Sequence, residues 1–186
     1  MQVIRIGDEL THVKDVAVEA ECMGIAFFQL TFIVGFTSPA PRVVRMSEEG
    51  KILNTLRYDS SGVKLFSRPE FIHVKNTTDS SRIFVSDLVK KTVYMLDDGL
   101  RLLQAFKIPS RGKPYGLADD ERGNVLVVDG GTHTLQLLDL TTGQWRTLLR
   151  KEEWLRRPVC LVYNQAMNKL YFGGNEDVVK VYTVSE

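Results

Sequence analysis

The sequence predicts an all-β fold, a β-propeller built from four-stranded antiparallel blades. Three observations predict it. The chain repeats itself at intervals of roughly 44 residues; each repeat divides into four short apolar runs; and the segments between the runs are rich in Gly, Asp, Asn and Thr. Turns this tight join only antiparallel neighbours, and repeats of this length are typical of propeller blades. The strand-like alternation and the turn residues exclude helical repeats of similar length.

The third repeat shows the pattern most clearly, from Pro114 to Leu149. Its four runs are YGLA, VLVVD, TLQLLDL and QWRTLL, and the segments between them are ADDERGN, GGTH and TTG. Each run has the length and composition of a strand, and each intervening segment has turn chemistry. This repeat therefore predicts one complete blade.

The other repeats are aligned by their opening prolines. Pro69 lies 45 residues before Pro114, and Pro158 lies 44 residues after it. A more divergent copy comes first and lacks the opening proline, while the last copy supplies only three strands. The predicted blades are about 23–56, 69–106, 114–150 and 158–186, so we expect about four blades of an incomplete propeller.

Residues 1–22 precede the repeats and allow two interpretations. They are the outer strands of a preceding blade, or they hold a closing strand, Val3–Ile6 or Val13–Glu19, for the last blade. We favour the first interpretation. It leaves unpaired sheet edges, which predict self-association.

Composition excludes several other classes of protein. The chain has 186 residues, 44% of them hydrophobic and 25% charged, with a net charge of +1. These values exclude disorder and give no overall attraction to nucleic acid or to an anionic membrane. The most apolar stretch, Met23 to Phe36, is too short to cross a bilayer as a helix, and the first 22 residues lack the layout of a signal peptide.

Cysteine usage predicts the compartment. Cys22 and Cys160 are the only cysteines, too few for a disulfide framework or for a four-ligand structural zinc site. We therefore expect a reduced, cytoplasmic setting. Cys160 lies within the apolar run PVCLV, which predicts a buried, unreactive thiol.

The blades resemble NHL repeats. The third carries P-Y-G-L-A, R-G-N and V-L-V-V-D, the second carries P-E-F-I and I-F-V-S-D, and no Gly-His or Trp-Asp pair of the WD40 type occurs at blade spacing. The fourth departs from the pattern, with Gly173 and Gly174 in place of Val-x-Asp. The first lacks both the opening proline and the Asp.

The resemblance covers residues from about 23 to 186 and implies a function. NHL propellers of this kind form the C-terminal domain of tripartite-motif ubiquitin ligases, where such a domain would recruit a substrate or another partner. The Cys/His clusters of the RING and B-box modules are absent from this sequence. We therefore expect the chain itself to be no enzyme.

Carboxylates at matching positions are interpreted as structural. Asp87 and Asp129 each follow the second strand of a blade, where Asp commonly accepts backbone N–H groups of a turn. The pairs Asp97-Asp98 and Asp119-Asp120 are interpreted as turn residues on the same grounds. No nucleophile motif or metal-ligand spacing occurs, so we expect no catalytic residue, no metal and no cofactor.

Cationic residues recur just before each opening proline and in the loops between second and third strands. In a propeller these segments emerge on one face of the disc, where they would form a basic face that suits phosphates or acidic peptides. Solvated loop charges, partly neutralised by acidic neighbours, are the other interpretation. The candidate binding residues are Arg68, Lys90, Lys91, Arg111, Lys113, His133, Arg156 and Arg157.

Three functions follow from these observations. The first is a non-catalytic protein-interaction propeller, and the second is single-stranded RNA binding on the basic face. The third is a calcium-dependent hydrolase of the lactonase type, which needs several carboxylates at the starts of the inner strands. Those positions hold Glu70, Tyr115 and Val159, of which only Glu70 is suitable. We therefore expect a protein partner, with RNA as the alternative, and no membrane association.

Overall fold

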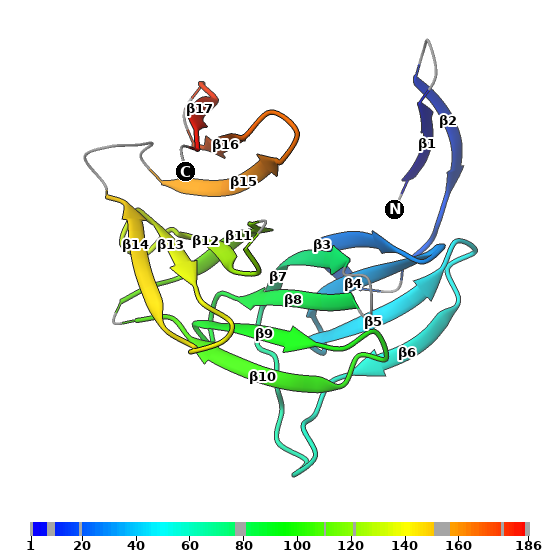
Figure 1. The fold of residues 1–186 in the computed structure, drawn as a ribbon. Helices are drawn as coiled ribbons and strands as arrows, with labels where there is room; N and C mark the ends of the chain where they lie inside the picture. Colours follow the sequence, from blue (N-terminus) through cyan, green and yellow to red (C-terminus); the bar gives the residue numbers. More distant parts are fainter. Residues whose placement is uncertain are drawn as a thin grey trace.

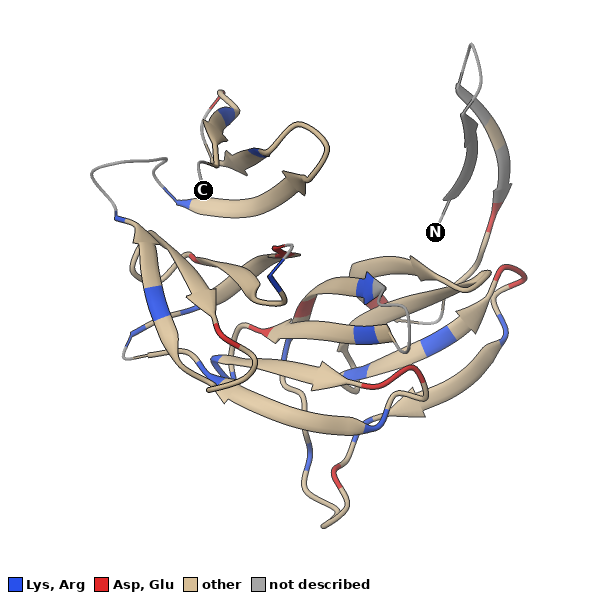
Figure 2. Ribbon diagram, viewed as in Figure 1, with Lys and Arg blue, Asp and Glu red and all other residues tan. Residues whose placement is uncertain are grey.

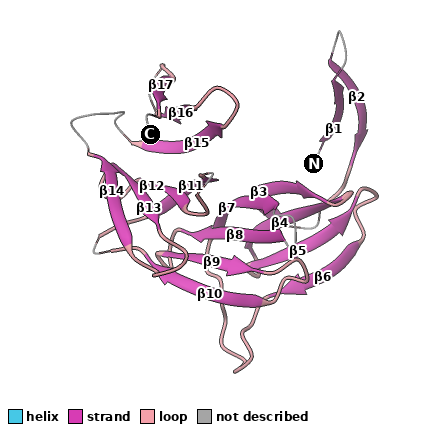
Figure 3. Ribbon diagram, viewed as in Figure 1, coloured by secondary structure: helices cyan, strands magenta, loops and turns pink. Residues whose placement is uncertain are grey.

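The structure is a computed structural model that describes residues 2–6, 10–18, 20–76, 81–109, 111–120, 122–150, 157–175 and 177–184. Strands, turns and loops account for all of these residues, as Figure 3 shows. No helix among them is long and apolar enough to cross a membrane.

The described strands form five antiparallel sheets. The first blade comprises β3 (Glu21–Phe28), β4 (Thr31–Ser38), β5 (Arg42–Ser47) and β6 (Ile52–Leu56). The second comprises β7 (Pro69–Asn76), β8 (Ser81–Asp87), β9 (Thr92–Leu96) and β10 (Leu102–Lys107). The third comprises β11 (Pro114–Asp119), β12 (Val125–Asp129), β13 (Thr134–Leu138) and β14 (Trp145–Leu149). The fourth has three described strands, β15 (Pro158–Asn164), β16 (Lys169–Gly174) and β17 (Lys180–Thr183).

The blades follow one another around a common centre, with β3, β7, β11 and β15 innermost (Figure 1). Each inner strand packs against the inner strand of the next blade. Within every blade the strands pair with their sequence neighbours only. The predicted β-propeller of antiparallel blades is therefore confirmed, and the opening prolines do begin β7, β11 and β15.

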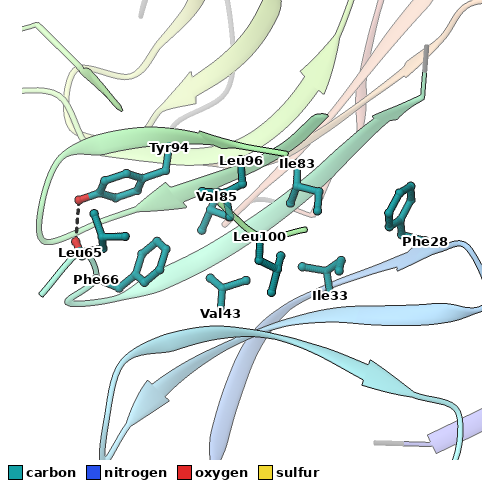
Figure 4. Packing of buried hydrophobic residues seen from close by; sticks show 10 residues of the cluster. All are labelled: Phe28, Ile33, Val43, Leu65, Phe66, Ile83, Val85, Tyr94, Leu96 and Leu100. Carbon is teal, nitrogen blue, oxygen red and sulfur yellow. Dashed lines mark hydrogen bonds between the residues drawn. The ribbon is translucent and has the colours of Figure 1, made fainter. Parts of the chain in front are cut away.

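The core lies between the blades and not within any one sheet. Figure 4 shows the cluster between the first and second blades, where Ile33 and Val43 meet Ile83 and Leu96, all at 0% exposure. Similar clusters join the second blade to the third and the third to the fourth. A sheet with two apolar faces is stable only when neighbours cover both, which is why the repeats depend on one another.

Glycine permits the close approach of the inner strands at two positions. A Cβ on Gly24 would lie 2.8 Å from the carbonyl oxygen of Glu70 in the next blade. A Cβ on Gly116 would lie 2.8 Å from Cα of Cys160. Both glycines therefore bring adjacent blades together near the centre of the propeller.

The N-terminal residues form a two-stranded sheet of their own, β1 (Gln2–Ile6) with β2 (Leu10–Asp15). The chain then crosses the outer face of the first blade, where Val16 is 4% exposed beside Phe36 and Val44. In Figure 1 this hairpin and the strands β15–β17 are separate from each other. Whether residues 1–22 belong to a preceding blade stays a prediction.

Two details of the fourth blade differ from expectation. Pro69 and Pro114 pair with Asp87 and Asp129, whereas Pro158 pairs with Gly174, so Gly174 and not Gly173 occupies the position of those aspartates. The prediction that Cys160 is buried is wrong, because its thiol lies on a face of β15 that no described residue covers. Sequence alternation correctly identified the strand but not the presence of a neighbour for each face.

Candidate functional site

Asp87 holds two loops of the second blade together. Its Oδ2 accepts hydrogen bonds from the backbone N–H groups of Ser67 (2.6 Å) and Arg68 (2.9 Å) in the loop that enters the blade. Its Oδ1 accepts from Val89 (3.0 Å) and Lys90 (2.7 Å) in the turn between β8 and β9. The carboxylate is fully buried. The predicted turn-capping role is therefore confirmed, and it extends to the entry loop.

Asp129 does the same in the third blade. Its Oδ1 accepts from the backbone N–H groups of Lys113 (2.8 Å), Gly131 (2.9 Å) and Thr132 (3.1 Å), and its Oδ2 accepts from the Thr132 hydroxyl (2.6 Å). These bonds bring the entry loop and the β12–β13 turn to the same edge of the blade. We call the surface made by residues 67–68, 88–91, 111–113, 130–133 and 157 the loop face.

The loop face carries most of the predicted cationic residues. Lys91, Arg111, Lys113 and Arg157 are exposed there, and none of them forms an ion pair with another described residue. Elsewhere basic and acidic positions alternate along the ribbon, as Figure 2 shows. The cations of the loop face are thus a local concentration in a chain whose total charge is nearly balanced.

Three of the other predicted residues lie at the same face in different surroundings. The Arg68 guanidinium is partly neutralised, because its Nη2 lies 3.2 Å from Oε1 of the buried Glu70. Lys90 and His133 are half-buried. The last predicted residue, Arg156, lies outside the described residues.

The turn geometry fixes where two of these side chains emerge. Lys91 (φ 54°) and His133 (φ 56°) each lie four residues after the capping aspartate and adopt the left-handed conformation. That conformation is costly for a residue with a Cβ, and it reverses the chain into the third strand. Neither turn holds glycine at this place, so a charged or polar side chain is retained at some cost in stability.

Sequence reasoning missed Lys107 as part of this face. Its Nζ donates to the carbonyl oxygen of Lys90 at 2.9 Å, and the next N–H, of Ile108, donates to the carbonyl oxygen of Lys91 at 3.0 Å. The fourth strand of a blade ends at the same edge as the second. That strand direction was the available signal.

A different polar cluster lies at the opposite end of the inner strands. His73 Nε2 is 2.6 Å from Oδ1 of Asp119, and Lys75 Nζ is 3.4 Å from Oδ2 of the same carboxylate. Asp119 had been interpreted as a turn residue, and that is wrong, because it ends β11 and links the third blade to β7 of the second.

Burial alone would raise the pKa of Asp119, but the hydrogen bond and charge of His73 and the charge of Lys75 outweigh it and hold this pKa below its ordinary 3.8. The carboxylate is therefore ionised at neutral pH and forms an ion pair with Lys75 between blades. A His-carboxylate pair without a neighbouring nucleophile is most simply a structural link.

The starts of the inner strands, where a hydrolase would need its ligands, offer one carboxylate. Glu70 is 7% exposed, and its Oε2 has no hydrogen-bond partner among the described residues. No group of three or more His, Cys, Asp or Glu side chains in the described part of the chain could hold a metal ion.

The sequence matches no family model and no curated protein. Solved structures match the fold. The computationally designed Ika4 protein is 16% identical, with 91% of this chain and 94% of that one covered and a TM-score of 0.63. A catalytically inactive virginiamycin B lyase from Staphylococcus aureus, with quinupristin, is 15% identical over 98% of this chain and 62% of the lyase, with a TM-score of 0.63. U3-55K is 12% identical over 90% of this chain and 50% of that one, with a TM-score of 0.70.

This chain thus spans less than two thirds of the length of the lyase and of U3-55K. At these identities the likeness establishes the β-propeller fold.

Proposed function

We propose that the chain is a non-catalytic protein-binding propeller that takes an acidic segment of a partner protein on its loop face. The observation that carries the proposal is the pair of buried aspartates, Asp87 and Asp129, which hold the cation-bearing loops in fixed positions. Preorganised loops lose little conformational entropy on binding. Exposed ammonium and guanidinium groups on them attract carboxylates.

A peptide suits this surface better than RNA. Proteins that bind single-stranded RNA stack its bases on exposed aromatic rings. The loop face contributes no Phe, Tyr or Trp among its described residues, but it does expose the apolar side chain of Val89 (61%) between the cationic positions. Mixed apolar and cationic contacts are typical of acidic peptide recognition. By its resemblance to NHL repeats, we further propose that the chain serves as the partner-recruiting part of a tripartite-motif type ubiquitin ligase.

Fluorescence anisotropy with two labelled probes tests the proposal. The probes are an acidic peptide that contains Leu and Asp, and an oligouridine of equal charge. We expect the peptide to bind and the double variant Lys91→Ala/Lys113→Ala to weaken binding by about 2- to 30-fold, which is the range for two exposed ion pairs. The control variant Lys51→Ala/Lys64→Ala changes the net charge equally at exposed positions outside the loop face.

Three results would contradict the proposal. Oligouridine could bind more tightly than the peptide, with affinity that falls steeply between about 50 and 200 mM salt. The control variant could weaken the peptide as much as the loop-face variant does. Neither probe could bind at low salt.

A further inference from the structure

A pocket of about 280 Å³ opens between the third and fourth blades. It lies at the edge opposite the loop face, where β11 ends and the β11–β12 and β15–β16 turns occur. Its size is just below the lower end of small-molecule sites, about 300 Å³, so it suits one or two side chains and not a cofactor. Its apolar floor consists of Leu126, Leu137, Leu148, Leu170 and Val184.

The corresponding space between the first and second blades is filled by a long side chain. Leu137 pairs with Leu126 in the third blade, as Arg45 pairs with Ile33 in the first. The Arg45 guanidinium crosses to the next blade and donates to the carbonyl oxygen of Asp98 at 3.2 Å. The shorter Leu137 cannot reach across in this way, which leaves the third interface open.

Peptide turns also contact this place in the first two interfaces. The β9–β10 turn buries Leu100 to 2% exposure in the core of the first interface, and its Gly99 carbonyl oxygen accepts from Asn54 Nδ2 at 2.6 Å. In the second interface, a Cβ on Gly143 of the β13–β14 turn would lie 3.7 Å from the Phe106 ring. The space is thus one that takes an apolar side chain carried on a turn of polypeptide.

Two guanidinium groups line the pocket. Arg122 and Arg146 are exposed, and neither forms an ion pair with another described residue. The one carboxylate in the lining, that of Asp120, accepts from Asn124 N and from Asn124 Nδ2, each at 2.7 Å, and so is already engaged. An apolar floor beside two guanidinium forks recognises an apolar group with carboxylates next to it.

We propose that this pocket binds an acidic linear motif of a partner protein, with a bulky apolar side chain in the pocket and flanking carboxylates on Arg122 and Arg146. The site shares no residue with the loop face and lies at the opposite edge. It therefore stands or fails independently of the function proposed above.

Methyl NMR on the whole chain tests the proposal, with the acetylated peptide Asp-Asp-Leu-Asp-Asp as the probe. We expect the floor leucine methyls to shift on titration, and the same peptide with Ser in place of Leu to leave them unshifted. Arg122→Gln/Arg146→Gln should weaken binding about 2- to 30-fold. The charge-matched control Lys51→Gln/Lys64→Gln and the loop-face variant Lys91→Ala/Lys113→Ala should leave this binding unchanged.

Leu137→Arg separates the pocket from simple charge attraction. It restores the arginine that fills the first interface and adds positive charge, so we expect it to abolish binding of the peptide. Stronger binding by this variant would overturn the proposal, because charge alone would then explain the affinity. Should this variant fail to fold, the exposed Arg122→Gln/Arg146→Gln pair still decides the question.

The other occupants are outcomes of the same titration. Decanoate shifting the floor methyls while the peptide does not would overturn the peptide motif in favour of a fatty acid. Light scattering that finds a dimer, lost in Leu137→Arg, would place a second copy of the chain in the pocket and overturn the proposal as well.

Discussion

The third and fourth blades share one ladder register but differ in the cover of one face. Equivalent rows cross the two sheets, Ala118–Leu126–Leu137 in the third blade and Val162–Tyr171–Val181 in the fourth. In the third blade this row faces the fourth, and Ala118 and Leu126 are about 5% and 4% exposed. In the fourth blade Val162 is 63% and Val181 50% exposed.

The difference shows that a blade does not by itself determine its core. Both rows are apolar and both lie on regular strands, yet only the row with a neighbouring blade is buried. Burial of apolar area is the main favourable contribution to folding. Equivalent substitutions in the two rows should therefore have very different effects on the free energy of unfolding.

The largest effect is expected for an aromatic of the covered row in the second blade. Phe84 is fully buried and has the ladder position of Tyr171. Phe84→Ala should lower the free energy of unfolding by about 3–5 kcal/mol, and Tyr171→Ala by about 1 kcal/mol or less. Urea denaturation measures both. Equal losses would show that the outer face of the fourth blade is covered in solution.

A second comparison concerns the blade entry, where Asp129 has Gly174 as its counterpart. Asp129→Ala leaves the N–H groups of Lys113, Gly131 and Thr132 without their acceptor and should cost about 2–4 kcal/mol. Asp129→Asn keeps one acceptor oxygen and should cost less. A Cβ on Gly174 would lie 2.7 Å from the Arg157 carbonyl oxygen, so Gly174→Asp should destabilise the protein and not improve it. Thermal unfolding of the three variants checks the order.

The repeat made the fold and the capping aspartates predictable. Proline spacing located the inner strands, and the Asp after each second strand indicated a turn cap, because these features depend on local sequence. The correct counterpart of that Asp in the fourth blade, Gly174, required the register shift between Pro158 and Cys160, which spacing does not reveal.

Contacts between blades were not predictable from spacing. His73 and Asp119 are 46 residues apart and meet only because β7 and β11 lie side by side. The pocket depends on Leu137 standing where the first blade has Arg45, which is visible only once ladder positions are matched. Long-range geometry of this kind follows from the stacking of blades and not from any one repeat.

The uncovered row should also promote association of the protein with itself. We expect Val162→Lys/Val181→Lys to weaken self-association about tenfold or more, because both side chains are at least half exposed and lysine opposes contact with an apolar surface. Analytical ultracentrifugation measures this effect. Exposed Leu103, on the outer strand β10, provides the matched control as Leu103→Lys. An equal effect of the control would remove the special role of the row.

The ion pair between the second and third blades should make stability depend on acid. The pKa of Asp119 is lower in the folded protein than its ordinary 3.8, so its contribution is complete above about pH 4 and is lost as the pH falls through the folded pKa. Asp119→Asn should cost at most about 1 kcal/mol at pH 6, because the pair is partly solvated, and nothing at low pH. Urea denaturation across this range tests it, with exposed Asp98→Asn as the control. A difference that grows on acidification would contradict the assignment.

The smallest expected effect separates stability from binding on the loop face. Lys91 adopts φ 54°, a conformation that costs an L-residue about 1–2 kcal/mol, and glycine's greater freedom in the unfolded chain offsets part of the gain. Lys91→Gly should therefore stabilise the fold by about 0.5 kcal/mol. The adjacent Lys90 lacks a positive φ, so Lys90→Gly should destabilise by a similar amount. If Lys91 is retained for its charge, Lys91→Gly will raise the melting temperature and weaken the acidic peptide at once, whereas a stabilised variant with unchanged affinity would leave the lysine without a binding role.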